Sequence, residues 1–580
     1  MLKNRLKPAL AALLLLTLAV PAFVLAQQTQ GRRRDNSATA PAQPGGPNAR
    51  ARRAPADATS ALEQDFSEAL SVIEDNYVDG QKLDYNNTFK SSIIGMLRTL
   101  DPHSNYYDAK EFEEMRTDWR SEYYGIGATI GNRTLGDDTD TYILDTFEGS
   151  PATKAGLRYG DRLVAVDGMD AHGRPSSEVR DKLLGPRGST VKVTFERAAD
   201  GQKQTVSLVR DAVPKPSVPD AYLLKNGVGY IDMTRGFNYT TGDEFQDALD
   251  KLHKQGMTAL VLDLRNNPGG LLDQAVKVAS EFLPTGLPVL SQRGRAYAPH
   301  TYRSENANPD NIPLVVLVNR NTASASEIVA GALQDHDRAL IIGETSFGKG
   351  LVQSIIPLEY GTALTLTSSK YYTPSGRLVQ RDYTNEGLYD YYTRGGTLHE
   401  DEAAGAPPAE KPVGPESKTD TGRSVYGGGG ITPDEPIKPR LLGAVEQRAV
   451  NPVFGFVREL VNGRIAGFDS YKVQRAITYD HAVKADEYPV TDELFKAFKT
   501  YVAAAPAYKL TDKQLDANRE FLARQIRYEI ATAAYGTVAA AQVLNVDDPQ
   551  VVKAVEDLPR ARELAAAAMR GRNPQQKSFE

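Results

Sequence analysis

The fold class is decided by PLVVLVNRNTASASEIVAGALQDHDRALIIGE, residues 313–344. Its first seven residues form an apolar, β-prone run, SASEIVAGALQD has the spacing of an amphipathic helix, and RALIIGE is a second strand pattern. The same alternation extends upstream to residue 226, through the strand patterns VGYIDM and TALVLDLR and the helical patterns GDEFQDALDKLHKQ and LLDQAVKVASEFL. Strands that alternate with helices are typical of an α/β layer with a largely parallel sheet, so we expect such a core here.

GETSFGKG, residues 343–350, differs by one residue type from a nucleotide-binding P-loop, which is G-x-x-x-x-G-K followed by Ser or Thr. Gly350 stands where that loop has its metal-binding hydroxyl. A P-loop also leads into a helix whose N-terminus holds the phosphates, whereas LVQSIIPLEYGTALTLT is alternating and β-prone. The sequence therefore argues against nucleotide binding. It leaves Lys349 as a turn residue or as a residue with another chemical role.

Ser324 lies in the turn between the PLVVLVN strand and the helix that follows it. A serine at a helix N-terminus is close to free N–H groups that favour developing negative charge, which suits a nucleophile. Ser and Thr are also ordinary N-cap residues, and a glutamate such as Glu327 is ordinary in a first helical turn. From this segment alone capping is the simpler interpretation of both residues.

A nucleophilic serine needs a base, because a free hydroxyl is a weak nucleophile. None of the seven histidines makes an obvious site with Ser324. His336 is near in sequence, but it lies at the far end of the same helix, ~18 Å away. A lysine can serve instead if burial lowers its pKa toward neutrality. Lys349 fits this role, because its flanking glycines allow close packing and Phe347 can desolvate the amine.

Taken together, TASASEIVAGALQD and RALIIGETSFGKGLVQ resemble the signature of the carboxy-terminal processing (tail-specific) proteases, which are Ser–Lys endopeptidases with an embedded PDZ domain. The nucleophile and base of that family are 25 positions apart, as are Ser324 and Lys349. The resemblance makes Ser324 the nucleophile and Lys349 the general base. It makes Gln353 a polar residue that orients the lysine.

The oxyanion hole of that family uses the N–H group after the nucleophile, which is that of Ala325 here. The second N–H group comes from the Gly-Gly pair that follows DLRNNP, which points to Gly270, with Gly269 as the neighbouring choice. Backbone N–H groups close to a helix start are natural donors to an oxyanion.

The resemblance covers about residues 61–440. LDPHSNYY (100–107) matches a segment before the family's PDZ domain, YYGIGATI matches its carboxylate-binding loop, and SSKYYTPSGR matches the end of the catalytic domain. The implied fold is multidomain α/β, with a crotonase-like protease core, an inserted β-rich PDZ domain and flanking helical regions. The expected organisation is a signal peptide at 1–26, a disordered linker at 27–60, an N-terminal helical region at 61–121, the PDZ domain at 122–212, the core at 213–440 with a flexible insertion at 385–430, and a helical C-terminal region at 441–580.

One position departs from the family pattern. Between the PDZ helix and the next strand the family often has Arg-Gly-Pro-Lys-Gly, whereas this chain has Leu184-Gly-Pro-Arg187-Gly. If the missing arginine couples the PDZ domain to the protease in relatives, the coupling must differ here. Whether Arg187 substitutes for it is left open by the sequence.

The resemblance implies that a substrate's C-terminus adds a strand to the PDZ domain, with the terminal carboxylate bound at Gly125, Ile126 and Gly127. Polypeptides with apolar C-termini are the expected substrates, and the reaction is peptide-bond cleavage for C-terminal processing or degradation. No metal, ATP or other cofactor is implied. The alternative is a PDZ scaffold that binds exported tails, either without catalysis or as a protease gated by an adaptor protein.

The first 26 residues have the pattern of a secretory signal. Lys3, Arg5 and Lys7 form a basic start, an apolar run extends to about Val20, and small residues precede Gln27. We expect export to the periplasm or to the outer face of the cytoplasmic membrane, where an uncleaved leader would keep the chain attached.

Charge and composition narrow the partners. Residues 61–580 hold 59 basic and 72 acidic side chains, a net charge of −13, which argues against nucleic acid. The absence of cysteine excludes disulfides, thiol catalysis and Cys-based metal sites. The helical patterns at 61–100 and 441–580 favour self-association into a homo-oligomer.

Overall fold

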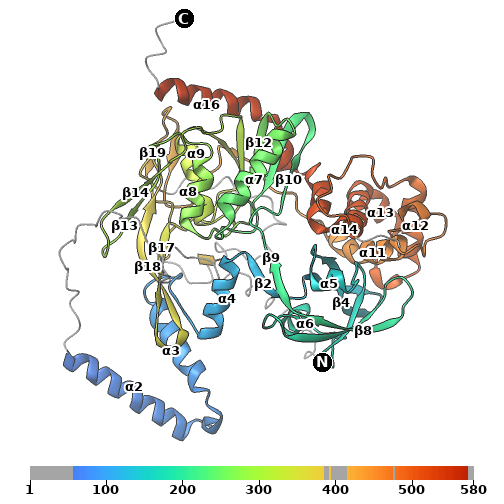
Figure 1. The fold of residues 1–580 in the computed structure, drawn as a ribbon, viewed down its shortest axis with the longest axis horizontal. Helices are drawn as coiled ribbons and strands as arrows, with labels where there is room; N and C mark the ends of the chain where they lie inside the picture. Colours follow the sequence, from blue (N-terminus) through green and yellow to red (C-terminus); the bar gives the residue numbers. More distant parts are fainter. Residues whose placement is uncertain (1–55, 385–390, 393–413, 474–476, 573–580) are drawn as a thin grey trace, which may run out of the picture.

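The computed structural model describes residues 56–384, 391–392, 414–473 and 477–572. Figure 1 shows an α/β core, a β-rich domain beside it, a helical C-terminal region and a projecting N-terminal arm. The expected signal peptide, 1–26, lies outside the described residues. Residues 27–55 of the expected linker also lie outside the described residues, whereas its last five residues, 56–60, are helical, since helix α2 begins at Ala56. Two alanines in its first three residues are strong helix formers.

The core sheet has six strands in the order β10-β11-β12-β15-β16-β21, and all neighbours are parallel except β10 and β11. The strand order follows the sequence, so successive crossovers step in one direction across the sheet. The helices of these crossovers are α7, α8 and α9. The bounds are β10 Asp220–Leu223, β11 Val228–Asp232, α7 Thr241–Lys254, β12 Ala259–Asp263, α8 Leu272–Ser280, β15 Leu314–Val318, α9 Ala325–Asp335, β16 Leu340–Gly343 and β21 Glu435–Pro436.

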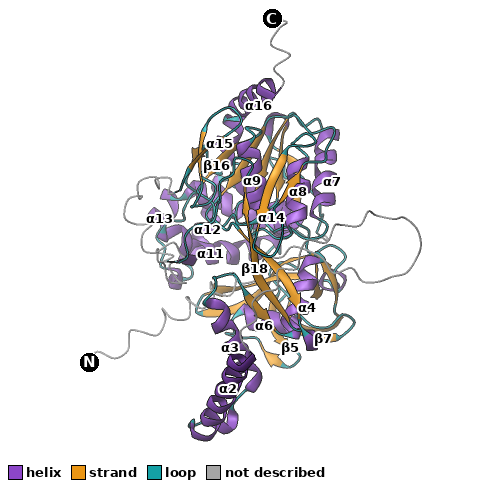
Figure 2. Cartoon of the chain, turned by 90° about the vertical axis from the view of Figure 1, so that its left-hand side faces the viewer, coloured by secondary structure: helices purple, strands orange, loops and turns teal. Residues whose placement is uncertain are grey.

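Both faces of this sheet are buried, which explains why its strands are continuous apolar runs rather than alternating ones. Leu262 and Val316 pack on one face with the helices α7, α8 and α9. Val261 and Val315, one residue earlier on the same strands, pack on the other face with α15 (Pro549–Glu556) and α16 (Leu558–Arg572). Figure 2 shows the helices on either side of the strands. The expected α/β core is therefore confirmed.

A second, antiparallel sheet lies against the core, in the order β1-β18-β13-β14 with β17 also paired to β18. Its strand β1 comes from the N-terminal region, where Tyr106 pairs with Leu364. The β13–β14 hairpin was not predicted from the sequence. The bounds are β1 Asn105–Tyr107, β13 Pro288–Arg293, β14 His300–Arg303, β17 Leu351–Pro357 and β18 Ala363–Tyr372.

The N-terminal arm consists of α2 (Ala56–Asn76) and α3 (Tyr85–Arg98), followed by α4 (Ala109–Trp119) on the body of the protein. Figures 1 and 2 both show α2 projecting away from the core. Its apolar side chains remain exposed, as for Leu62 at 69% and Ile73 at 46%. None of the described helices is both long enough and apolar enough to cross a membrane.

The β-rich domain is inserted through a two-stranded ribbon, β2 (Glu122–Gly125) with β9 (Asp211–Pro214). Its sheet has the order β3-β4-β5-β7-β8, with β6 paired to β5, so β3 is an edge strand. Its apolar core includes Ile143, Leu163 and Phe195. The bounds are β3 Ala128–Leu135, β4 Asp138–Thr146, α5 Pro151–Lys154, β5 Arg162–Val166, β6 Met169–Asp170, α6 Ser176–Leu183, β7 Thr190–Glu196 and β8 Lys203–Val209.

The flexible insertion expected at 385–430 is partly wrong. Residues 385–390 and 393–413 lie outside the described residues, but β19 (Glu416–Lys418) and β20 (Ser424–Tyr426) form a hairpin. The glycine run that follows is packed, since a Cβ on Gly427 would lie 2.7 Å from Leu378 O and one on Gly430 would lie 2.5 Å from Ser346 O. These glycines permit close backbone contact, which was mistaken for flexibility.

The C-terminal region is helical, as expected. Helices α11 and α14 pack against the β-rich domain, where Tyr142 and Tyr159 share a core with Phe454 and Ile526. The last two helices, α15 and α16, return to the core sheet. The region therefore contacts both domains. The remaining bounds are α11 Ala444–Val461, α12 Asp492–Ala503, α13 Asp512–Ala517 and α14 Arg519–Asn545.

Candidate active site

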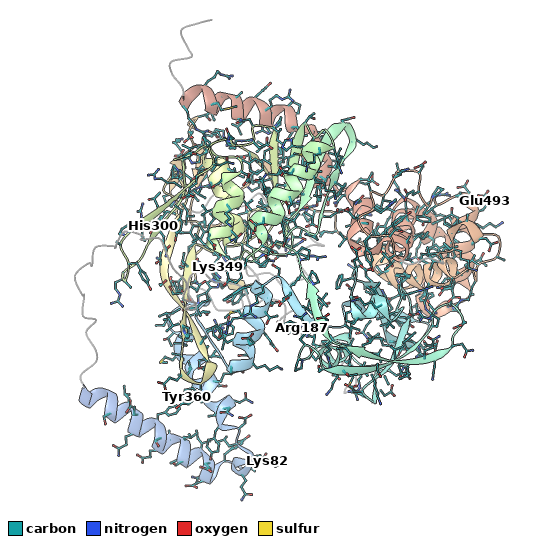
Figure 3. The ribbon with its side chains drawn as sticks, in the orientation of Figure 1. Lys82, Arg187, His300, Lys349, Tyr360 and Glu493 are labelled. Carbon is teal, nitrogen blue, oxygen red and sulfur yellow. The ribbon has the colours of Figure 1, made fainter. Side chains whose placement is uncertain are left out.

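The loops that follow β12, β15 and β16 carry the residues singled out in the sequence. These strands are parallel neighbours, so their carboxyl ends lie at one edge of the sheet. Ligand and catalytic residues of open α/β sheets gather at this edge. Figure 3 places Lys349 there, close to the start of the long β17–β18 ribbon. The edge thus brings together Gly270, Ser324 and Lys349 from three separate loops.

Ser324 is the N-cap of α9 and has a strained backbone, with φ of 56° and ψ of −114°. Non-glycine residues rarely adopt such angles, and when they do they are concentrated at functional sites. Its backbone N–H donates to Glu327 Oε2 at 2.8 Å, and Tyr371 donates its hydroxyl to Ser324 O at 3.2 Å. The residue is 6% exposed. An ordinary cap residue needs no such conformation.

The loop 344–350 does not form a phosphate cradle. The N–H groups of residues 346–350 all donate within the protein, to Ile431 O, Thr322 O, both oxygens of Glu327 and Gln380 Oε1. The chain then continues as β17, not as a helix. A P-loop needs free N–H groups at a helix start, so the structure agrees with the exclusion made from the sequence.

Glu327 connects the turn that carries Ser324 to the loop 344–350, which carries Lys349. It is fully buried and accepts hydrogen bonds from four donors: the backbone N–H groups of Ser324, Gly348 and Lys349, and the hydroxyl of Ser346. The N–H groups of Ser324 and Lys349 both end on Oε2, each at 2.8 Å. Burial raises the pKa of Glu327 despite these four bonds. The predicted role of Glu327 at the helix start is confirmed by its bond to the Ser324 N–H, which completes a capping box. The sequence did not reveal its other three donors, which come from residues 346–349.

Lys349 is 5% exposed. Burial lowers the pKa of its amine to about 7, against the opposing effect of the nearby carboxylates Asp101 and Glu327. At neutral pH a large fraction of this lysine is therefore the free amine. A lysine of this kind can accept a proton, which an exposed turn lysine cannot do at the same pH.

Gln353 follows on β17, where residues 351–353 are all buried. In a strand whose side chains strictly alternate between two faces, either Val352 or both Leu351 and Gln353 would be exposed. All three are buried here because the pairing register with β18 breaks between Val352 and Gln353. The side-chain nitrogen of Gln353 donates to Thr367 Oγ1 at 2.9 Å. Its carbonyl oxygen is buried and accepts no hydrogen bond from the described part of the chain. The orientation of Lys349 by Gln353 stays a prediction.

The expected oxyanion donors lie beside the serine. A Cβ on Gly269 would be 2.7 Å from Ala325 N and 2.8 Å from Ser324 Cβ, so this glycine lies directly against the turn that carries Ser324. The N–H of Gly269 is already used, since it donates to Asn267 Oδ1 at 2.9 Å. Within the described ranges, the N–H groups of Gly270 and Ala325 donate to no protein acceptor. This difference favours Gly270 over Gly269.

Two residues near Lys349 were missed in the sequence. Asp101 and His103 belong to the LDPHSNYY segment before the β-rich domain, and both lie close enough to interact electrostatically with Lys349. His103 packs edge-on against Phe347 and bonds through Nε2 to the Tyr391 hydroxyl at 2.8 Å. Burial and the neighbouring cations lower its pKa well below the usual range, so its imidazole is neutral. The short sequence motif gave no hint of this neighbourhood.

His336 is bound elsewhere. Its Nδ1 contacts Asp420 at 3.0 Å and its Nε2 contacts Pro288 O at 2.8 Å, at the far end of α9 from Ser324. In the described residues no group of three or more His, Asp and Glu side chains is arranged to hold a metal ion.

The expected carboxylate loop joins the β2–β9 ribbon to the edge strand β3. The N–H groups of Ile126 and Gly127 donate to no acceptor in the described structure. Gly127 has φ of 74°, and a Cβ there would lie 2.3 Å from Ser150 Cβ. The side chain of Ile126 is buried in the β-rich domain, so its backbone is the part that remains available. Gly125 lies inside the ribbon, opposite Asp211.

Leu184 lies beside this loop, since a Cβ on Gly125 would be 3.1 Å from Leu184 Cδ2. The side chain is 37% exposed and therefore adds apolar surface next to the carboxylate loop. Arg187 does not reach the core: its Nε donates to Asp211 Oδ1 at 2.8 Å within the same domain. The buried Arg210 instead binds the end of α6, donating to Leu183 O at 3.1 Å.

Known protein families match two separate parts of the chain, the α/β core and the β-rich domain. The family model of peptidase family S41 matches residues 227–386, and a PDZ domain model matches residues 148–197. A carboxy-terminal-processing protease of Bartonella bacilliformis is 38% identical over 325 residues, which cover 54% of this chain and 72% of that protein. The carboxy-terminal processing protease CtpA of Bacillus subtilis is 33% identical over 317 residues, covering 54% and 66%. Among solved structures, a photosystem II D1 C-terminal processing protease is 33% identical with a TM-score of 0.31, covering 54% of this chain and 89% of that one.

Fold and matches together define a PDZ-containing peptidase with a mixed α/β core and a helical C-terminal region. The chain belongs to peptidase family S41, among its carboxy-terminal processing proteases.

Proposed function

We propose that this protein is a serine endopeptidase that uses a Ser324–Lys349 dyad to cleave exported proteins bound by their C-terminal tails. The observation that carries the proposal is the geometry around Glu327, whose Oε2 binds the backbone N–H of both residues at 2.8 Å. The strained backbone of Ser324 and the lowered pKa of Lys349 support the same assignment.

In this mechanism Ser324 Oγ attacks the scissile carbonyl carbon, and the neutral amine of Lys349 takes the hydroxyl proton. The N–H groups of Gly270 and Ala325 donate to the oxyanion of the tetrahedral intermediate. The Lys349 ammonium then protonates the leaving amine as the peptide bond breaks. Water, deprotonated by the same lysine, hydrolyses the acyl-enzyme and regenerates Ser324.

The PDZ domain would bind the substrate tail along the free edge of β3, as an added strand. The open N–H groups of Ile126 and Gly127 would bind the terminal carboxylate, with Gly125 next to them. Leu184 would contribute an apolar surface there, which suits an apolar terminal side chain.

Export to the periplasm or to the outer face of the cytoplasmic membrane is part of the proposal and rests on the sequence of the first 26 residues. A homo-oligomer is also proposed, with the exposed apolar face of α2 against a second copy. Replacement of Ile73 by Asp should then lower the mass measured by light scattering, whereas the neighbouring control Ser71→Asp should not.

A second candidate is a protease that stays inactive until an adaptor protein or a bound tail completes its site. The carbonyl oxygen of Gln353, which accepts no hydrogen bond in the described structure, favours this form. In this second candidate Ser324 and Lys349 keep the same catalytic roles, and the only difference is that activity requires the adaptor protein or the bound tail.

The test compares the chain without residues 1–26 with its Ser324→Ala and Lys349→Ala variants, on an unstructured polypeptide with an apolar C-terminus and without ATP. Lys370→Ala is the matched control, because this exposed lysine is on the adjacent strand β18. Fragments detected by mass spectrometry with the parent and the control alone would support the dyad. Cleavage by Ser324→Ala would contradict it, and tail binding without cleavage by any form would favour the adaptor-gated candidate.

A further inference from the structure

Asp101, His103 and Ser104 form a buried turn that the proposed mechanism does not use. Ser104 is fully buried and Asp101 is 6% exposed. The Asp101 carboxylate accepts three hydrogen bonds from within the turn, from the N–H groups of His103 and Ser104 at 2.8 Å each and from the Ser104 hydroxyl at 2.6 Å. These bonds hold the turn together, and it leads into β1, which pairs with β18.

A chain of hydrogen bonds continues from this turn to the site. Ser104 Oγ, which donates to Asp101, accepts the backbone N–H of Thr367 at 3.0 Å. Thr367 Oγ1 in turn accepts the side-chain nitrogen of Gln353 at 2.9 Å. Thr367 and Gln353 are direct partners in the β17–β18 register, beside the register break. Three residues outside the proposed dyad thus determine how the Gln353 side chain is held.

The two ends of a glutamine amide are chemically different, since the nitrogen only donates and the carbonyl oxygen only accepts. A protonated lysine only donates. Because the Gln353 nitrogen is bound to Thr367, the end that remains for a lysine is the oxygen. If the amide turned over, it would present N–H groups to the ammonium and oppose its protonation.

We propose that Thr367, held by Ser104 and Asp101, is a positioning residue that fixes the Gln353 amide with its carbonyl oxygen available to Lys349. The proposal rests on the proposed function of Lys349 as general base. It assigns a role to the DPHS turn, which lies more than two hundred positions before the lysine.

The same turn places charge near the base. The charged groups that act on Lys349 are Asp101, from the turn, and Glu327, from α9, while His103 beside it is neutral. Both carboxylates favour the ammonium form. The turn therefore acts on the lysine twice, through the orientation of Gln353 and through the charge of Asp101.

The first experiment replaces Thr367 by Val, which keeps the branched shape and removes the acceptor. We expect kcat to fall about tenfold or more, as for lost outer contacts of a catalytic group, with KM for the tail nearly unchanged. Thr367→Ser should restore kcat, since it restores the hydroxyl. Ser354→Ala is the matched control, because Ser354 is adjacent on β17 and bonds Ser368 Oγ at 2.7 Å.

The second experiment replaces Asp101 by Asn. Removal of this charge should lower the pKa of Lys349 by roughly one unit, so the acid limb of the pH–kcat/KM profile should move to lower pH. The same shift should appear in the pH dependence of Lys349 acylation by a small anhydride, measured by mass spectrometry in the Ser324→Ala background. This readout does not need proteolysis.

An unchanged kcat in Thr367→Val, or an equal loss in the Ser354→Ala control, would overturn the proposal. So would crystal structures in which the Gln353 amide keeps its place in Thr367→Val. If the parent cleaves nothing, the proposed function fails, but the crystal structures and the acylation profile still decide whether Thr367 and Asp101 act on Gln353 and Lys349.

Discussion

The pKa of Lys349 is set by its surroundings in the fold. Its amine has a pKa of about 7 because it is buried, and only the neutral form can take a proton from Ser324. We expect kcat/KM to rise with pH up to about 7 and then level off, falling about tenfold for each pH unit below that value. Lys349→Arg should lose about a hundredfold or more at every pH, because arginine stays protonated. A pH profile of the variant that parallels the parent would contradict the assignment of the base.

Glu327 gives a second prediction at this scale. Glu327→Gln keeps the size of the side chain but replaces one acceptor oxygen by a nitrogen that donates. At least one of the four donors around it then faces another donor in a buried site, which costs about 1–3 kcal/mol of unfolding free energy. Urea unfolding monitored by fluorescence measures this loss, and activity should fall with it. Glu344→Gln, in the same loop but partly exposed, is the control; equal effects in both variants would argue against the link between the two loops.

At the scale of the elements, the loop after β12 depends on glycine for its close contact with the turn that carries Ser324. Gly269 has φ of 90°, and a Cβ there would lie 2.6 Å from Ala323 O. Gly269→Ala should therefore push the loop away from Ser324 and abolish activity. Gly286 has the same φ but no atom within 4 Å of its Cβ position, so Gly286→Ala separates backbone strain from collision. That control should lose only about 1 kcal/mol of stability and keep its activity in the peptide-cleavage assay.

Some features of the helices and strands could be predicted from the sequence pattern, and others could not. The core strands and helices were predicted because their apolar spacing is local. The register break at Gln353 was not, since residues 351–353 follow no simple alternation and the break is defined by pairing with β18. The glycines at 427–430 were interpreted as flexible for the same reason: their packing partners lie in distant segments.

At the scale of the whole molecule, the C-terminal helices hold the PDZ domain. Tyr159 of that domain donates its hydroxyl to the buried Glu529 of α14 at 2.7 Å. Tyr159→Phe removes this donor from a buried carboxylate and should lower the unfolding free energy by about 1–3 kcal/mol. Calorimetry should show the loss, whereas the exposed Tyr297→Phe should have no effect. An unchanged transition in Tyr159→Phe would mean that the two regions are not coupled through this contact.

The sequence by itself determined the α/β core, because apolar periodicity is local. The PDZ insertion and the Ser324–Lys349 pair followed from the resemblance of its motifs to those of the carboxy-terminal processing proteases, whose nucleophile and base are 25 positions apart, as these two residues are. Tertiary structure decided what acts on that pair. Glu327 binds both loops, Thr367 and Ser104 hold Gln353, and Asp101 acts on Lys349 from the N-terminal region. Hydrogen bonds and burial depend on distances in space, and these partners come together only when the second sheet folds against the core.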